Sequence, residues 1–195
     1  MDRPAFTALP LALLVCLTCV LTGCGATIVP PPRSGDMVSV FVTDYGRHSS
    51  LVLPDGAGDL VEYAWGDWDW FAVNKNGILN GVAAVFFSHG ATFGSRHLDA
   101  GPERAHLARV IGCERLLRVD AERARVGALR DELNARLDRH VGTMVYNPAS
   151  GFSFVRDDEH YAGWHNCNHV TARWLRELGC QVEGSSFTSK FKLAR

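Results

Sequence analysis

The stretch HNCNHVTARWL, residues 165–175, predicts the start of a helix with a cysteine in its first turn. Asn166 is a favourable N-cap residue, because its side-chain oxygen can accept hydrogen bonds from the free N–H groups of the first turn. Apolar residues then recur at helical spacing as far as Leu178, and Gly179 provides a stop. Cys167 would therefore lie at a helix N-terminus as a nucleophile, a metal ligand or a buried thiol.

The composition is that of one ordinary globular domain. The chain has 195 residues, of which 47% are hydrophobic and 21% charged, and its formal net charge is −1. Lys and Arg are spread along the chain without the basic stripe that nucleic-acid binding requires. We therefore expect no nucleic-acid partner.

The first 23 residues are typical of a signal peptide. A weakly positive start, MDR, precedes an apolar run over residues 8–21 that is short for a membrane anchor. The run ends in LTGC, residues 21–24, which resembles a bacterial lipobox. The resemblance implies that Cys24 is acylated and becomes the mature N-terminus, with several acyl chains giving stable membrane attachment. A conventionally cleaved signal with an incidental cysteine is the alternative.

The sequence after Cys24 predicts where the domain begins and where it is held. Gly25, rather than an aspartate, fits outer-membrane sorting by resemblance to lipoproteins of Gram-negative bacteria, with the domain facing the periplasm. Three consecutive prolines in residues 28–35 favour an extended, semi-rigid spacer. We therefore expect a signal peptide over residues 1–23, a lipidated tether over 24–36 and one domain over 37–195.

Periodicity predicts an α+β domain. Two β-rich runs lie within residues 37–54, a turn follows at 55–58, and residues 60–65 resume strand character, which indicates a hairpin. Alternating apolar residues over 107–119 predict further strands. Asp120 is a candidate N-cap for an amphipathic helix that runs to about His140.

An apolar run at helical spacing also occupies residues 78–87, near His89 and His97, which are interpreted as ordinary loop or surface histidines. The mature domain keeps three cysteines: Cys113, Cys167 and Cys180. A bridge between Cys113 and Cys180 would leave Cys167 free, and the alternative is that no disulfide forms.

The predicted position of Cys167 favours a reactive thiolate. Free N–H groups and the helix dipole lower a cysteine pKa at a helix N-terminus, and the Cys167 N–H itself can act as an oxyanion donor. His48, at the entrance of a strand, is the candidate base. Glu62, on the neighbouring strand, is the candidate residue to orient His48, with Asp67 in reserve.

These motifs carry a family resemblance. GRHSSLVL, LVEYAWGD and NCNHVTARWL, in this order, resemble the circularly permuted, papain-like NlpC-type superfamily, which includes lecithin:retinol acyltransferase-like proteins. HSSLVLP, EYAWGDWDWF and NCNHVTARWLRELG are also similar to uncharacterised bacterial lipoproteins that share a domain of unknown function. The resemblance covers most of residues 37–184. It implies an antiparallel sheet packed with helices, with Cys167 as nucleophile, His48 as base and Glu62 in the third, polar position.

Three other interpretations remain open. His160, His165, Cys167 and His169 could bind zinc, although helical spacing brings only 165 and 169 together. A buried thiol at a helix start also needs no function. Finally, the aromatic cluster of Trp65, Trp68 and Trp70 could line a groove for a glycan or peptide in a non-catalytic envelope lipoprotein.

The sequence therefore predicts a lipid-anchored cysteine hydrolase or acyltransferase that acts on an amide or ester. Cell-wall peptide amides are the first expected substrate class, because of the compartment, and acyl groups of lipids or lipoproteins are the second. No cofactor and no metal ion are expected for this chemistry.

Overall fold

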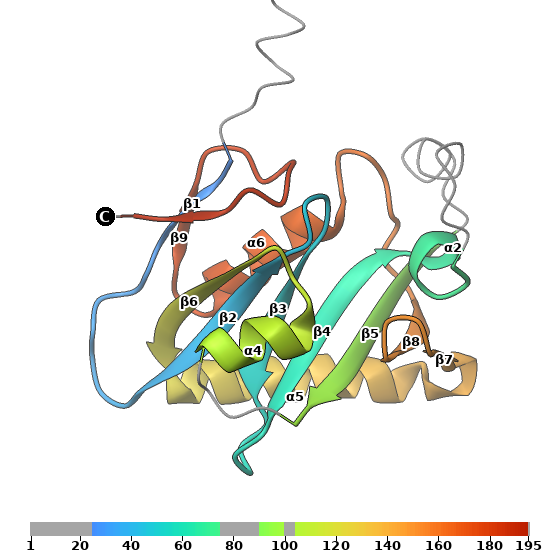
Figure 1. Cartoon of the computed structure of the whole chain (residues 1–195), viewed down its shortest axis with the longest axis horizontal. Helices are drawn as coiled ribbons and strands as arrows, with labels where there is room; N and C mark the ends of the chain where they lie inside the picture. The colour runs from blue at the N-terminus through green and yellow to red at the C-terminus, as the bar shows by residue number, and fades with distance from the viewer. Residues whose placement is uncertain (1–24, 75–89, 100–103, 195) are drawn as a thin grey trace, which may run out of the picture.

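The computed structural model describes residues 25–74, 90–99 and 104–194, which form an α+β fold built on a seven-stranded antiparallel sheet (Figure 1). The strand order is β6-β2-β3-β4-β5-β8-β7. The strands of this sheet are β2 (Met37–Asp44), β3 (Ser49–Pro54), β4 (Leu60–Asp67), β5 (Ala91–Leu98), β6 (Arg115–Glu122), β7 (Val145–Asn147) and β8 (Phe152–Asp157). The helices are α2 (Trp68–Phe71), α4 (Arg104–Ile111), α5 (Arg123–Arg139), the short η1 (Val141–Thr143) and α6 (Cys167–Glu177).

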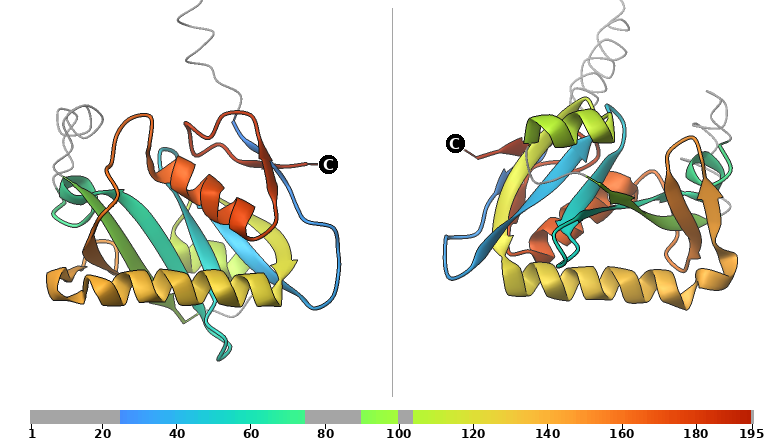
Figure 2. Two further views of the ribbon diagram at one scale, coloured as in Figure 1. Left: turned by 180° about the vertical axis from the view of Figure 1, so that it is seen from behind. Right: turned by 60° about the horizontal axis from the view of Figure 1, so that its bottom comes forward.

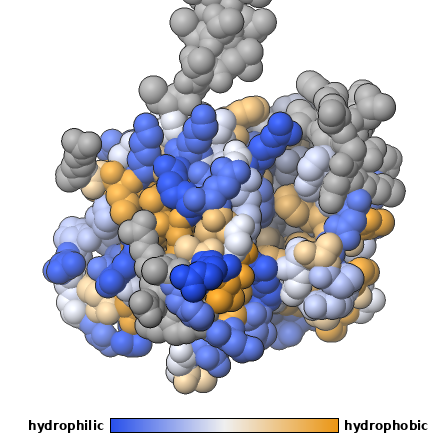
Figure 3. Space-filling view, viewed as in Figure 1, coloured by the Kyte–Doolittle hydropathy of each residue, from blue (hydrophilic) through white to orange (hydrophobic). Residues whose placement is uncertain are grey.

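Helices cover both faces of the large sheet, as the two views of Figure 2 show. On one face, α5 and α6 pack over the odd-numbered residues of β3, such as Leu51 and Leu53, and form the main core. On the other face, Leu107 and Ile111 of α4 pack against a smaller cluster that includes Val52. Alternate side chains of a strand point to opposite faces, which explains why β3 is buried on both sides. The face drawn in Figure 3 is mostly hydrophilic, with separate apolar areas between the polar residues.

Several predicted elements are confirmed. The hairpin of β3 and β4 turns at residues 55–58, where the Asp55 carboxylate accepts hydrogen bonds from three backbone N–H groups, those of Ala57, Gly58 and Asp59. The helix predicted from residue 167 is α6. Among the described residues no helix has the length and apolarity that crossing a membrane requires.

Other boundaries differ from the prediction. Of residues 107–119, which were predicted as strand, 115–119 lie in β6, whereas 107–111 belong to α4, which buries Leu107 and Ile111 against the sheet. Asp120 lies in β6, and the long helix begins at Arg123 after Glu122. The predicted helical run at 78–87 and His89 lie outside the described residues.

A second, three-stranded sheet contains the first described residues. Strand β1 (Thr27–Val29) lies between β9 (Gln181–Glu183) and β10 (Lys192–Leu193). β1 pairs antiparallel with β9 and parallel with β10. The prediction placed residues 24–36 in a tether before the domain, whereas the structure pairs residues 27–29 with the C-terminal strands. The proline segment therefore connects β1 to β2 within the fold.

Candidate functional site

The N-terminus of α6 is fixed by a reciprocal cap. The Asn166 side chain accepts hydrogen bonds from the N–H groups of Asn168 (3.0 Å) and His169 (3.3 Å), and His169 Nδ1 accepts one from the Asn166 N–H (3.4 Å). This capping box satisfies N–H groups that a helix start leaves unpaired. Cys167 is the first residue of the helix, as the sequence predicts.

The thiol of Cys167 is buried beside the first residue of β3. Cys167 is 5% exposed, and its Sγ donates to Asn168 Oδ1 at 3.7 Å. Burial raises the pKa of Cys167 to about 11, although hydrogen bonds from the backbone N–H groups of Ser49, Asn168 and Cys167 itself lower it. The predicted low thiol pKa is therefore wrong for this state, because desolvation outweighs the helix N-terminus.

An opening between β3 and β4 allows the contact between the start of α6 and Ser49. The pairing of the two strands ends at Leu51 and Tyr63, while β4 continues to Asp67 paired with β5. Beyond that point Ser49 pairs only with β2, through Asp44. The Ser49 hydroxyl donates to Asn168 Oδ1 (2.8 Å), which joins β3 to the first turn of α6. The nucleophile candidate thus lies next to the corner formed by residues 48 and 49.

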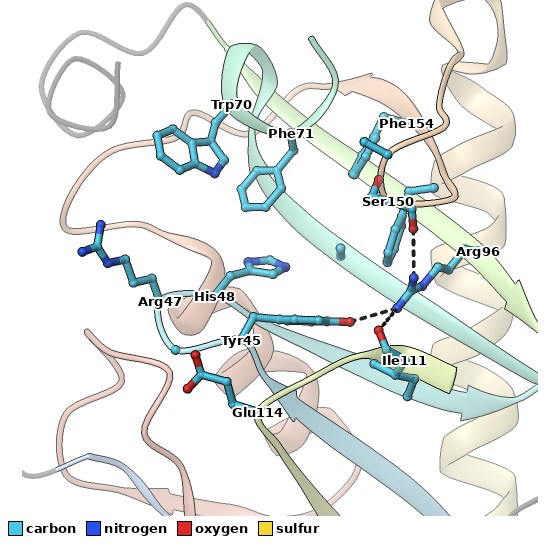
Figure 4. A pocket seen from close by; sticks show the side chains of 14 residues that line it. Tyr45, Arg47, His48, Trp70, Phe71, Arg96, Ile111, Glu114, Ser150 and Phe154 are labelled. Carbon is cyan, nitrogen blue, oxygen red and sulfur yellow. Dashed lines mark hydrogen bonds between the residues drawn. The ribbon is translucent and has the colours of Figure 1, made fainter. Parts of the chain in front are cut away.

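The imidazole of His48 lies on the other side of this corner. Its ring packs between Tyr45 and Phe71, with centroid distances of 5.9 and 4.6 Å. Nδ1 of His48 is buried and has no hydrogen-bond partner in the described part of the chain. Burial lowers the pKa of His48 to about 4, so the ring is neutral near pH 7. Figure 4 shows the His48 ring inside a pocket, with Phe71 on one side and Tyr45 on the other.

Glu62 has other partners than His48. Its carboxylate is fully buried and accepts hydrogen bonds from Tyr45 Oη (2.7 Å), from Ser50 Oγ and from Arg96 Nε (2.8 Å). Val52, four residues after His48, is the residue of β3 that pairs with Glu62. The predicted hydrogen bond between Glu62 and His48 is therefore not formed.

Arg96 organises the floor of the pocket. Besides Glu62 it donates to the carbonyl oxygens of Ser150 (2.9 Å) and Ile111 (3.1 Å) and to Tyr45 Oη (3.0 Å). One buried ion pair thus ties β4 and β5 to the end of α4 and to the loop before β8. Neither Tyr45 nor Arg96 was predicted from the sequence, because no motif signals a pairing that depends on strand register.

Asp67, the reserve candidate, caps α2. Its carboxylate accepts a hydrogen bond from the Trp70 N–H at 2.9 Å. The negative charges of Cys167 as thiolate and of Asp67 both raise the pKa of Tyr161, in addition to burial. Tyr161 therefore shares its electrostatic environment with Cys167 and Asp67, and it stacks on Trp65 at a centroid distance of 5.5 Å.

A pocket of about 650 Å³ opens beside His48. Its wall is mainly aromatic, and its polar residues lie near the floor and the rim (Figure 4). Cys167 is not among the residues that line it. Its lining includes His48, Tyr45, Arg96, Trp70, Phe71, Phe152 and Phe154.

The predicted aromatic cluster does not form one surface. Trp65 is 1% exposed in the main core, and Trp68 is 8% exposed with the Arg156 guanidinium 4.0 Å from its ring centroid. Of the three tryptophans, Trp70 alone lines the pocket.

The four residues considered as alternative zinc ligands have separate surroundings. His165 Nε2 bonds to Glu159 at 2.9 Å, His169 belongs to the capping box, and His160 is exposed. No group of three or more His, Cys, Asp and Glu is arranged to hold a metal ion within the described ranges.

Cys113, Cys167 and Cys180, the cysteines within the described ranges, are free, and their placement forbids the considered bridge. Cys113 packs with the smaller cluster under α4, whereas Cys180 belongs to the main core on the opposite face of the sheet.

No protein-family model matches the chain, no curated protein is significantly similar to it, and no solved structure matches it.

Proposed function

We propose that this chain is a lipid-anchored cysteine hydrolase or acyltransferase of the cell envelope that acts on an amide or ester. One observation carries the proposal: the Ser49 N–H is directed at the Cys167 thiol, and the residue before Ser49 is His48, whose buried Nδ1 has no partner in the described residues. A buried polar atom without a partner is rare and calls for a role. Accepting a proton from the Cys167 thiol, once the ring turns toward it, is such a role.

The two pKa values define the resting state. With a thiol pKa near 11 and an imidazole pKa near 4, both groups are neutral at pH 7. The thiol is therefore activated only as it reacts, by general base catalysis, rather than stored as a thiolate. No hydrogen bond joins the two side chains among the described contacts, so the proposal requires the His48 ring to turn toward the opening between β3 and β4 when substrate binds.

The reaction follows from these roles. Cys167 Sγ attacks the carbonyl carbon while His48 takes the thiol proton, and the N–H groups of Cys167 and Ser49 stabilise the oxyanion. The bond to the leaving amine or alcohol breaks as His48 returns the proton to it. Water or another acceptor then attacks the thioester, with His48 again as base, and the free thiol is regenerated.

The lipid anchor on Cys24 and the circularly permuted papain-like form of the fold belong to the same proposal. Two features support this fold assignment. A histidine lies at the entrance of a strand of the sheet, and a cysteine later in the sequence begins a helix that covers the sheet. The aromatic pocket beside His48 favours substrates with an apolar group near the reacting carbonyl.

Labelling with an activated acyl ester probe tests the catalytic pair. Cys167→Ser should abolish labelling, and His48→Ala should slow it by about 100-fold or more, as loss of a general base does. Cys180→Ser is the matched control, because Cys180 is also buried and burial also raises its pKa to about 11. His97→Ala controls for loss of an exposed histidine. Wild-type labelling in His48→Ala would refute the assigned base.

A second candidate is a non-catalytic binding module. The pocket supports this candidate, because its aromatic wall is already formed. Cys167 does not line the pocket, and its thiol is protonated at neutral pH. Trp70→Ala should then weaken binding of soluble cell-wall glycan or peptide fragments, measured by calorimetry. Binding by the wild type together with an unreactive Cys167 would favour the module over the enzyme.

A further inference from the structure

The start of the described chain and the start of α6 lie at the same end of the molecule. Figure 1 shows β1 beginning at the upper end, beside the loop that leads into β10, and Figure 2 shows the same arrangement from behind. Gly25 forms a bridge with Ser185, and the carbonyl of Phe187, two residues later, accepts hydrogen bonds from Asn166 (3.2 Å) and Asn168 (3.2 Å). The path from Gly25 to the cap of Cys167 is therefore short.

No spacer separates Gly25 from the folded body. A Cβ at Gly25 would lie 1.7 Å from the Lys190 carbonyl oxygen, so the backbone is held in close contact there. Ala26 and Ile28 are both 0% exposed. The three prolines follow β1, so they do not lengthen the connection between Cys24 and β1. A lipid on Cys24 would thus be attached one residue, about 3.8 Å between Cα atoms, from the body.

Two large side chains project from this end. Trp164 is 79% exposed and Phe187 is 54% exposed. The Asn166 amide joins the turns that carry them, because its Nδ2 donates to the carbonyls of Gly163 (3.3 Å) and Phe187 (3.2 Å). Exposed tryptophan is favoured at the level of lipid headgroups, where the ring meets both apolar and polar surroundings.

We infer that this end of the molecule docks directly on the lipid bilayer, with Trp164 and Phe187 at the headgroup level. The α6 N-terminus then faces the membrane, and the site receives amide or ester groups that lie at the membrane surface. Substrates attached to lipid fit this geometry, whereas cell-wall peptides at a distance from the bilayer do not. The inference rests on the proposed acylation of Cys24, and it goes beyond that proposal by orienting the site.

Quenching of tryptophan fluorescence tests the orientation. The acylated full-length chain is placed in liposomes of phosphatidylethanolamine and phosphatidylglycerol with brominated acyl chains, which quench tryptophans near the lipid. Wild type should be quenched, and Trp164→Phe should lose most of that quenching, because Trp164 is 79% exposed, whereas Trp65, Trp68 and Trp174 are buried and Trp70 is half-buried in the pocket wall. Equal quenching of wild type and Trp164→Phe would overturn the inference.

A matched variant tests whether a second exposed apolar surface contacts the membrane instead. Val141, Met144, Val145 and Tyr146 form another exposed apolar group, near the end of α5. Tyr146→Trp, made in the Trp164→Phe background, places a tryptophan there. It should remain unquenched. Strong quenching of this variant would mean that the molecule lies on the membrane by the wrong end.

Two further measurements separate this inference from the proposed function. Mass spectrometry reads acylation at Cys24, and probe labelling in detergent reads catalysis without a membrane. An acylated, labelling chain with unquenched Trp164 refutes the orientation alone. Quenched Trp164 in a chain that does not label supports the orientation and refutes catalysis, whereas absence of acylation refutes both the anchor and the orientation.

Discussion

At the scale of single residues, His48 combines burial with an unsatisfied ring nitrogen. The ring contacts Tyr45 and Phe71, and no partner for Nδ1 exists among the described residues. Burial lowers the His48 pKa from 6.5 to about 4, because an apolar environment disfavours the charged imidazolium. Because the imidazole pKa is lowered, protonating His48 in the folded protein is costly. The free energy of unfolding therefore depends on pH through this residue.

Lowering the pH should therefore destabilise the protein through His48. Between about pH 6.5 and 4 the unfolded chain binds a proton at this histidine and the folded chain does not, so the free energy of unfolding falls as the pH drops. The loss is at most about 3 kcal/mol and levels off below pH 4. Urea unfolding at several pH values should show this slope in wild type and a flatter one in His48→Gln. Parallel slopes would disprove the linkage.

The sequence predicted the helix start at Cys167 more reliably than the pKa of the thiol or the partners of the other site residues. The Asn166 cap follows from local rules on helix starts, whereas the contact of the α6 start with the first residue of β3 is long-range and no local rule predicts it. The direction of the thiol pKa was wrong, because desolvation depends on what covers the helix tip. Glu62 was assigned to His48 because both lie on neighbouring strands, but register places Glu62 opposite Val52, and the buried Arg96 captures its carboxylate.

At the scale of elements, the first turn of α6 is the best-defined part of the site. Asn166 acts in two ways: its oxygen caps the helix, and its nitrogen holds the turns at Gly163 and Phe187. Helix α5 was also predictable, since its apolar face of Val126, Leu129, Leu133 and Leu137 recurs at helical spacing. Helix α4 was missed, because its eight residues make only about two turns, too few for periodicity to distinguish helix from strand.

Removing the two functions of Asn166 separately should give different results. Asn166→Ala should lower the free energy of unfolding by about 1–2 kcal/mol through loss of the cap. Asn166→Asp keeps an N-cap acceptor but loses the Nδ2 donor, so it should be less destabilising. Its added negative charge beside Cys167 should raise the thiol pKa further and slow alkylation of Cys167 at pH 8. Urea unfolding and iodoacetamide kinetics measure the two effects, and faster alkylation in Asn166→Asp would contradict this account.

At the scale of the whole molecule, the fold joins its first and last described strands in one small sheet. β1 lies between β9 and β10, and its buried residues Ala26 and Ile28 belong to the same core as α5 and α6. This arrangement was not predictable from sequence. Three-residue strands give no periodic signal, and three prolines after β1 favour a linker. Only long-range pairing reveals that residues 25–29 belong to the fold.

Gly25 is the position at which this arrangement can be tested. A Cβ there would overlap the Lys190 backbone carbonyl, so Gly25→Ala must displace β1 or the segment before β10. Misfit of this kind costs about 1–3 kcal/mol, and we expect a loss of that size in the free energy of unfolding, measured with urea in detergent. Gly127→Ala is the control, because it lies in α5 with open space around the added methyl group, where alanine favours the helix. If Gly25→Ala were as stable as wild type, residues 25–29 would be a free linker, and the short path from a lipid on Cys24 to Cys167 would be lost with the sheet.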